Sequence, residues 1–177
     1  MALATPSAQA ILVTGASAGI GYAVATTLIQ SPCKHSILVT GRRSEALSRL
    51  KQLDPTRVFV AAGDMLDPTF PAAVVKTAYA KLGRLDALVL NHGTLGQCER
   101  IADSDVKDWQ DAFMVNVSSN VALVSFCCTL FGSGPLCCCL AVRGLCAEVG
   151  ECVDSISAET VAREQRAGYH DFVGGGT

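Results

Sequence analysis

Three glycines in the segment ILVTGASAGIGYA, Gly15, Gly19 and Gly21, stand between an apolar run and a segment of helical period. Glycines allow a tight turn and let the backbone approach a pyrophosphate, while the free N–H groups and the dipole of the next helix face the negative charge. A plain glycine-rich turn is the alternative, but the strand before it and the helix after it supply the context that phosphate binding requires. The spacing therefore predicts that this turn binds the pyrophosphate of a dinucleotide.

Two arginines, Arg42 and Arg43, follow the second apolar run in the segment VTGRR. In a dinucleotide-binding fold this point meets the adenosine ribose, where an NAD site places a carboxylate that binds the ribose hydroxyls. Guanidinium groups suit a 2′-phosphate instead, because they bind phosphate oxygens through paired, charged hydrogen bonds. We therefore expect NADP (NADPH) rather than NAD as the cofactor. The alternative is two solvated arginines at the start of a helix.

Short apolar runs rich in β-branched residues alternate with longer segments of helical period between residues 9 and 90. This alternation is typical of parallel strands joined by crossover helices, and continuous apolar strands indicate a sheet covered on both faces. The predicted strands are 10–14, 36–40, 57–61 and 85–90, and the predicted helices are 19–30, 44–53 and 71–83. The predicted fold class is α/β, a Rossmann-type doubly wound parallel sheet. Since a complete sheet of this type has about six strands, we expect it to be incomplete at its C-terminal side.

Five ordered motifs carry a resemblance to a known family. They are TGASAGIG, TGRR, GDM with Asp64, NHG at 91–93, and Asn116 within FMVNV. Over roughly residues 9–131 they resemble the cofactor-binding part of the short-chain dehydrogenase/reductase (SDR) family. The resemblance implies an NADP-dependent oxidoreductase that transfers a hydride to a small carbonyl compound.

The same resemblance implies roles for individual residues. Those expected at the cofactor are Gly15, Ser17, Gly19 and Ile20 along the pyrophosphate, Asp64 facing the adenine, and Asn91 bracing the fourth strand beside the adenosine ribose. His92 stands where the family more often has alanine, which is similar to fungal-type reductases that act on dicarbonyl or pterin-like compounds. A loop histidine that simply packs is an equally good interpretation of His92.

The catalytic part of the resemblance stops at Asn116. The family's reaction uses a tyrosine whose pKa, ordinarily about 10, is lowered by a lysine one helical turn away, and the asparagine matching Asn116 holds a water in the proton relay. No lysine follows Lys107, and Val173 stands where a lysine after Tyr169 would be. We therefore expect impaired or no turnover in this chain. A non-catalytic NAD(P)-binding or interaction protein is the alternative function.

A long apolar helix is predicted from about residue 106 to residue 131, with Ser104 as its N-cap and three aspartates near its positive end. In the family the matching helix often packs against its twin, so the resemblance implies a homo-oligomer through helix 106–131. The uncharged segment 121–142 is long enough to span a bilayer, but the Gly-Ser-Gly-Pro run at 132–135 would break a single helix. The preferred interpretation is a buried helix ending near residue 131, a turn and a short buried strand.

Seven of the nine cysteines lie between Cys127 and Cys152. They contain no Cys-x-x-Cys pair, and adjacent cysteines on a strand point to opposite faces, so we expect no metal site. The amino-acid composition also changes, to an uncharged and cysteine-rich stretch, where the family motifs stop. This coincidence predicts a nucleotide-binding domain at 1–131 and an atypical tail at 132–177, poorly ordered or only partly packed. It also predicts that the chain is either truncated or frame-altered after about residue 131.

The net charge of −2 at pH 7, without a run of lysines or arginines, argues against a nucleic-acid partner. The first fifteen residues lack the basic region and cleavage site of a secretory signal, which predicts a cytoplasmic protein whose cysteines stay reduced. The expected partners are therefore a nicotinamide dinucleotide and, only if the site is complete, a small carbonyl substrate.

Overall fold

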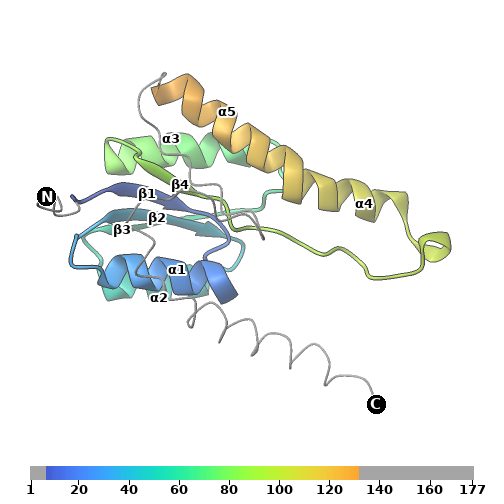
Figure 1. The fold of residues 1–177 in the computed structure, drawn as a ribbon, viewed down its shortest axis with the longest axis horizontal. Coiled ribbons are helices and arrows are strands. Elements are labelled where there is room, and N and C mark those ends of the chain that lie inside the picture. The colour runs from blue at the N-terminus through green and yellow to red at the C-terminus, as the bar shows by residue number, and fades with distance from the viewer. Residues whose placement is uncertain (1–6, 132–177) are drawn as a thin grey trace, which may run out of the picture.

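Four parallel strands form one sheet in the order β3-β2-β1-β4 (Figure 1). The computed structural model of the chain describes residues 7–131, and within them the strands are β1 (Ala10–Val13), β2 (Ser36–Gly41), β3 (Val58–Ala62) and β4 (Ala87–Val89). The chain order reverses between β1 and β4, and ligands of doubly wound sheets bind at the carboxyl ends of the strands at such a reversal. The predicted Rossmann-type parallel sheet is confirmed, with four strands in the described part.

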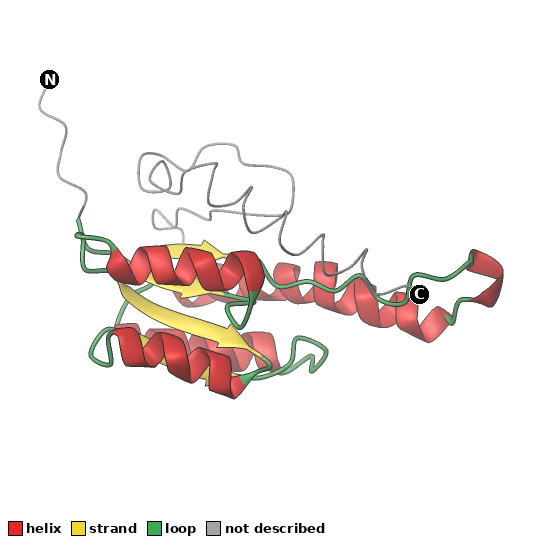
Figure 2. Cartoon of the chain, turned by 90° about the horizontal axis from the view of Figure 1, so that it is seen from below, coloured by secondary structure: helices red, strands yellow, loops and turns green. Residues whose placement is uncertain are grey.

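Helices cover both faces of the sheet, as the view in Figure 2 shows. On one face lie α1 (Gly19–Gln30) and α2 (Ser44–Leu53), and on the other lie α3 (Phe70–Leu82) and α5 (Ser119–Phe131). Between β4 and α5 the chain forms a long loop, a short helix η1 (Ile101–Asp103), α4 (Val106–Phe113) and a π-helical turn η2 (Met114–Ser118).

The two faces hold two separate hydrophobic clusters, because neighbouring residues of a strand point in opposite directions. Ile11 and Val13 of β1 pack in the cluster under α1 and α2, whereas Leu12 packs in the cluster under α3 and α5. All three side chains are at most 3% exposed. Burial on both faces explains why the strands appear in the sequence as continuous apolar runs.

The helix that begins at Val106 differs from its prediction at two points. Its N-cap is Asp105, whose carboxylate accepts a hydrogen bond from the Lys107 N–H at 2.9 Å, so the prediction of Ser104 was wrong. The Ser104 hydroxyl instead donates to the Ile101 carbonyl at 2.9 Å and closes η1. The second difference is η2, which interrupts the helix with an extra residue per turn, a feature often found at functional sites.

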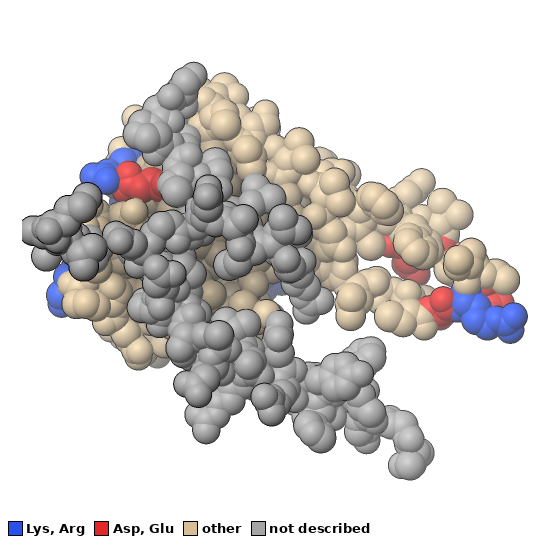
Figure 3. Space-filling view, in the orientation of Figure 1, with Lys and Arg blue, Asp and Glu red and all other residues tan. Residues whose placement is uncertain are grey.

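The helical stretch from Val106 to Leu130 is mostly exposed. Of its side chains only Ser119, Leu123 and Cys127 are buried, so the prediction of a buried helix holds for one side of α5, the side that packs against α3, and is wrong for the rest. Figure 3 shows an almost uncharged surface along α5. By length and composition alone, the 25 residues of this stretch are also sufficient to cross a membrane.

Several predictions concern residues outside 7–131, the part that the structure describes. They are the cysteine-rich tail 132–177, the short strand near 136–142, the second half of the bilayer-length segment 121–142, and the segment around Tyr169.

Candidate nucleotide-binding site

A cavity of about 490 Å³ opens at the carboxyl ends of the strands. Its wall is built from the turn after β1, the ends of β2, β3 and β4, and the inner side of α4 and η2. All the residues predicted to bind the cofactor, except Gly21, line it: Gly15, Ser17, Gly19, Ile20, Arg42, Arg43, Asp64 and Asn91. The fold thus brings together residues that are up to 76 positions apart, as the 3.4 Å hydrogen bond between the Asn91 side chain and the Gly15 carbonyl shows.

The turn after β1 needs glycine at two positions for its backbone. Gly15 and Gly19 have φ angles of 65° and 54°, in the left-handed region that favours glycine. At Gly15 there is also no room for a side chain, because a Cβ would lie 2.7 Å from the His92 Cα. Helix α1 starts at Gly19 without a side-chain cap and without an acidic residue in its first turn. Its first N–H groups are therefore available to an anion in the cavity.

Gly21 lies behind the turn rather than in the cavity wall. A Cβ at Gly21 would overlap the Gly15 carbonyl and the side-chain nitrogen of Asn91. The Asn91 N–H, in turn, donates to the Thr14 hydroxyl at 3.0 Å. Gly21 therefore permits the close packing of α1 against the turn and the end of β4, and Asn91 holds that end of β4 against β1.

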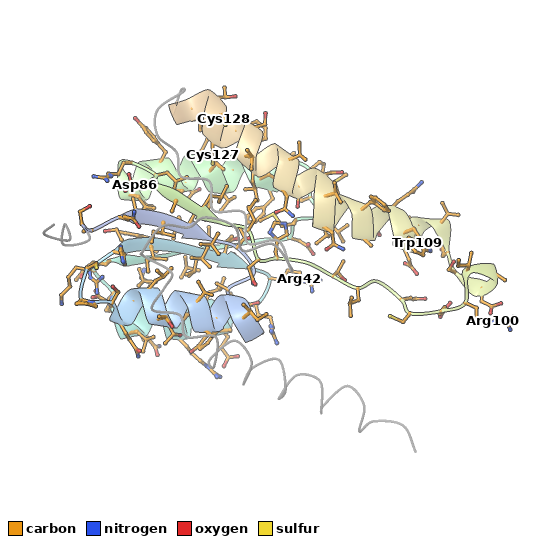
Figure 4. All side chains as sticks on the ribbon, in the orientation of Figure 1. Arg42, Asp86, Arg100, Trp109, Cys127 and Cys128 are labelled. Carbon is orange, nitrogen blue, oxygen red and sulfur yellow. The ribbon has the colours of Figure 1, made fainter. Side chains whose placement is uncertain are left out.

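Two arginines stand at the rim of the cavity, after β2. Both side chains are exposed, and Figure 4 shows Arg42 at the carboxyl ends of the strands, opposite the edge where Asp86 lies. The Arg43 guanidinium donates to the Ser17 carbonyl at 3.3 Å, which ties the turn to the start of α2. Among the described residues, no hydrogen bond or ion pair engages the Arg42 guanidinium, so its charge is available at the rim.

Asp64 closes the cavity on the β3 side. Its carboxylate accepts a hydrogen bond from the Leu66 N–H at 3.1 Å, in a tight turn after the strand. The preceding residue, Gly63, donates to the Gly41 carbonyl at 3.1 Å, which fixes this turn beside the end of β2. A side chain at Gly63 would overlap the Phe70 ring, so the wall is closely packed here.

His92 bridges two segments of the site. Its Nδ1 lies 2.8 Å from the Thr14 hydroxyl oxygen, and its Nε2 lies 2.8 Å from the Ser119 hydroxyl oxygen. Burial lowers the pKa of His92, partly offset by the nearby Val115 carbonyl. The ring is thus held by packing and hydrogen bonds, in agreement with the interpretation of a histidine that packs.

Asn116 lies in η2, and its amide group is committed to the loop after β4. It accepts a hydrogen bond from the Thr94 N–H at 2.8 Å and donates to the Thr94 carbonyl at 2.7 Å. Asn116 lines a neighbouring hollow of about 280 Å³, together with apolar side chains such as Trp109 and Phe113. The structure therefore places Asn116 beside the cavity at the strand ends and outside its wall.

Comparison with known proteins identifies the family. A family model described as short chain dehydrogenase matches residues 9–134. The chain belongs to the short-chain dehydrogenase family. Its relatives include an uncharacterized oxidoreductase of Schizosaccharomyces pombe, 34% identical over 124 residues, which cover 70% of this chain and 49% of the relative. They also include the benzil reductase ((S)-benzoin forming) of Saccharomyces cerevisiae, 33% identical over 72% of this chain and 50% of the relative.

Solved short-chain dehydrogenases share the fold. A short-chain dehydrogenase from Streptomyces avermitilis superposes with a TM-score of 0.64 and 29% identity, over 72% of this chain and 46% of that one. L-sorbose reductase of Gluconobacter frateurii, solved with NADPH and L-sorbose, gives a TM-score of 0.62 and 29% identity, over 70% of this chain and 47% of that one. This chain therefore spans about half the length of the relatives it matches.

Two residues of the site, Thr14 and Ser119, were not predicted from the sequence. Thr14 joins the ends of β1 and β4, since its hydroxyl oxygen accepts hydrogen bonds from the backbone of Asn91 and His92 at 3.0 and 3.3 Å. In the sequence Ser119 looks like any serine within a helix, and only the tertiary structure brings its hydroxyl to His92. A threonine between an apolar strand and the first glycine was the available signal for Thr14.

Within residues 7–131 the structure contains no group of His, Cys, Asp or Glu side chains that could hold a metal ion.

Proposed function

We propose that this chain binds NADP(H) as the nucleotide-binding part of a short-chain dehydrogenase and has little or no turnover. The observation that carries the proposal is the cavity at the strand ends, which combines a glycine turn and an uncapped helix start with two exposed arginines at its rim. The dinucleotide, when bound, supplies the hydride of the family's reaction.

The residues of the cavity fit the successive parts of the nucleotide. Gly15 and Gly19 keep the backbone of the turn free of side chains, so that the first N–H groups of α1 can bind the pyrophosphate. Asp64 would face the adenine, and Asn91 would hold β4 beside the ribose. The L-sorbose reductase that shares this fold was solved with NADPH, which supports a nicotinamide dinucleotide as the ligand class.

The preference for the phosphorylated form rests on Arg42 and Arg43. An exposed guanidinium without a partner among the described residues is available to a 2′-phosphate, which would form charged hydrogen bonds with it. A carboxylate that would repel this phosphate is absent from the segment VTGRR. The arginines therefore favour NADP(H) over NAD(H).

The expectation of impaired turnover rests on the residues that follow Asn116. The family's tyrosine needs a lysine four positions later to lower its pKa, and no lysine follows Lys107. The Asn116 amide is itself occupied by the Thr94 backbone. Hydride transfer to a small carbonyl compound would therefore lack its proton donor in this chain.

A calorimetric titration of the full-length chain with NADPH and with NADH tests the binding proposal. We expect NADPH to bind at least about tenfold more tightly than NADH, because charged hydrogen bonds contribute about 1.5–3 kcal/mol. The Arg42→Ala/Arg43→Ala variant should lose this difference. The Lys51→Ala/Lys81→Ala variant removes the same charge from exposed positions outside the cavity and should keep it. An NADPH preference that survives in the arginine variant would contradict the assignment.

Self-association through α4 and α5 is a second proposed function, favoured by a row of exposed apolar side chains. They recur every three or four residues, so they share one side of the helix, and they are Val106, Trp109, Phe113, Val117 and Val121, between 48% and 69% exposed. Figure 4 shows Trp109 projecting from α4. Exposed apolar surfaces of this kind mark interaction sites, and we propose that a second copy of the chain covers this one.

A further inference from the structure

His92 connects three segments that are distant in the sequence. Its ring lies between Thr14, at the end of β1, and Ser119, at the start of α5, with 2.8 Å to each hydroxyl oxygen. Thr14 is fully buried and Ser119 is 2% exposed, so water does not compete for either contact. The connection spans 78 residues on one side and 27 on the other.

The other partners of the two hydroxyl groups decide the direction of these hydrogen bonds. The Ser119 hydroxyl donates to the Val115 carbonyl at 2.7 Å, so it is free to accept from the His92 Nε2–H. Burial lowers the pKa of His92, which favours the neutral ring, and with the ring proton on Nε2 the Nδ1 atom accepts from the Thr14 hydroxyl, whose oxygen already accepts from the N–H groups of Asn91 and His92. The Val89 carbonyl, 3.1 Å from the Thr14 hydroxyl, then gives up its hydrogen bond with that hydroxyl. It still accepts a hydrogen bond from the Thr14 N–H at 2.9 Å, so it keeps a donor. We therefore assign one directed series from Thr14 through His92 and Ser119 to Val115.

One end of this series lies next to the cavity wall and the other end is part of it. Thr14 directly precedes Gly15, the first glycine of the turn, and Val115 lines the opposite wall within η2. Asn116, the neighbour of Val115, fixes the loop at Thr94, which also lines the cavity. A displacement of the turn is therefore transmitted to η2 through hydrogen bonds.

We propose that His92 is a positioning residue that couples the nucleotide-binding turn to the π-helical turn η2. The coupling to the nucleotide rests on the proposed function, while the mechanical link between turn and η2 exists in the free protein. Nucleotide binding at Gly15 then orders η2, and the packing of η2 changes nucleotide affinity by the same factor.

Hydrogen exchange of the full-length chain, measured by mass spectrometry, tests the link across the molecule. Ser119→Ala removes the acceptor of His92 and should raise amide exchange of the remote turn at 14–19 by about fivefold, the equivalent of one lost hydrogen bond. His92→Ala should raise exchange of both 14–19 and 114–118. Ser48→Ala is the matched control, because the Ser48 hydroxyl makes the same bond to the carbonyl four residues earlier, at 2.9 Å, in α2.

Saturating NADPH provides the second arm of the experiment. In the unaltered chain it should protect 14–19 and 114–118, and in His92→Ala it should protect 14–19 only. Changes confined to α5 in Ser119→Ala, or unchanged protection of 114–118 in His92→Ala, would overturn the coupling. A lack of NADPH protection anywhere in the unaltered chain would refute the proposed function instead, and the comparison of the free proteins would still decide the coupling. If His92→Ala does not fold, Ser119→Ala carries the test.

Discussion

The turn from Gly15 to Gly21 and helix α4 lie on either side of one cavity, yet their packing differs completely. The turn is fixed by the protein itself, through Asn91, Thr14 and the close approach of His92 to Gly15. Helix α4 buries none of its residues, and its large side chains Trp109 and Phe113 are more than half exposed, at 54% and 60%. The family match covers both regions.

This difference separates what residues 7–131 can do alone from what requires another surface. The turn, the strand ends and the arginine rim form most of the cavity wall, and the inner side of α4 and η2 of the same chain completes it. The row of apolar side chains on α4 and α5 costs free energy while it faces water, at about 25 cal/mol for each Å² of apolar surface. We infer that nucleotide binding is a property of the single chain and that α4 reaches its stable environment by association.

Gly21→Ala should have the largest effect, because it disrupts the close packing of the turn from Gly15 to Gly21. The new methyl group would overlap the Gly15 carbonyl and the Asn91 side chain, and backbone cannot yield as a flexible side chain does. We expect a loss of about 3 kcal/mol in the free energy of unfolding, measured by urea titration, together with loss of NADPH binding.

Gly83→Ala is the control for this prediction. Gly83 has a φ angle of 72°, but no atom lies within 4 Å of the position that the new methyl group would take, so only backbone strain of about 1 kcal/mol is expected. NADPH affinity should not change in this variant. A Gly21→Ala protein as stable as Gly83→Ala would show that the close packing behind the turn is dispensable.

Phe113→Glu should act on association and spare the cavity. A charge in the middle of the exposed apolar row opposes its burial against a second copy, so a dimer should become a monomer in sedimentation or light scattering. The free energy of unfolding of the monomer should change little, since Phe113 is 60% exposed. Leu53→Glu, at an equally accessible apolar position (51% exposed) at the end of α2, should leave the assembly intact. Dissociation by both variants, or by neither, would refute the proposed surface.

His35→Asn should have the smallest effect, on the pH dependence of the sheet region. Burial, followed by the Arg57 guanidinium, lowers the pKa of His35 from 6.5, and its Nδ1 accepts the Gln9 N–H at 3.1 Å. The unfolded chain therefore takes up this proton first, so stability is complete above pH 6.5 and falls as the pH drops from there toward the folded pKa.

An asparagine at position 35 offers a carbonyl oxygen near the same place but does not titrate. The slope of the free energy of unfolding against pH, just below pH 6.5, should therefore become smaller, and His92, whose pKa is also lowered, contributes to the slope that remains. Urea titrations across this range measure the slope. An unchanged slope in His35→Asn would assign the pH sensitivity to other groups.

The sheet and the residues that meet at the carboxyl ends of its strands were predictable because their signals are local. Each strand is a short apolar run, the glycines mark the turn, and the arginines directly follow β2, so the element bounds agree within a few residues. The N-cap of α4 was missed because Ser104 and Asp105 both suit a cap, and the contact of Ser104 with Ile101 decides between them. The contact between His92 and Ser119 had no local signal, because tertiary packing alone brings the two residues together.

Nucleotide binding without turnover is tested most directly by calorimetric titration of the full-length chain with NADPH and NADH, combined with an assay of carbonyl-dependent NADPH oxidation on the same preparation. We expect NADPH to bind at least about tenfold more tightly than NADH, with no oxidation above the uncatalysed rate. Absence of NADPH binding, tighter binding of NADH, or oxidation at ordinary enzymatic rates would contradict it.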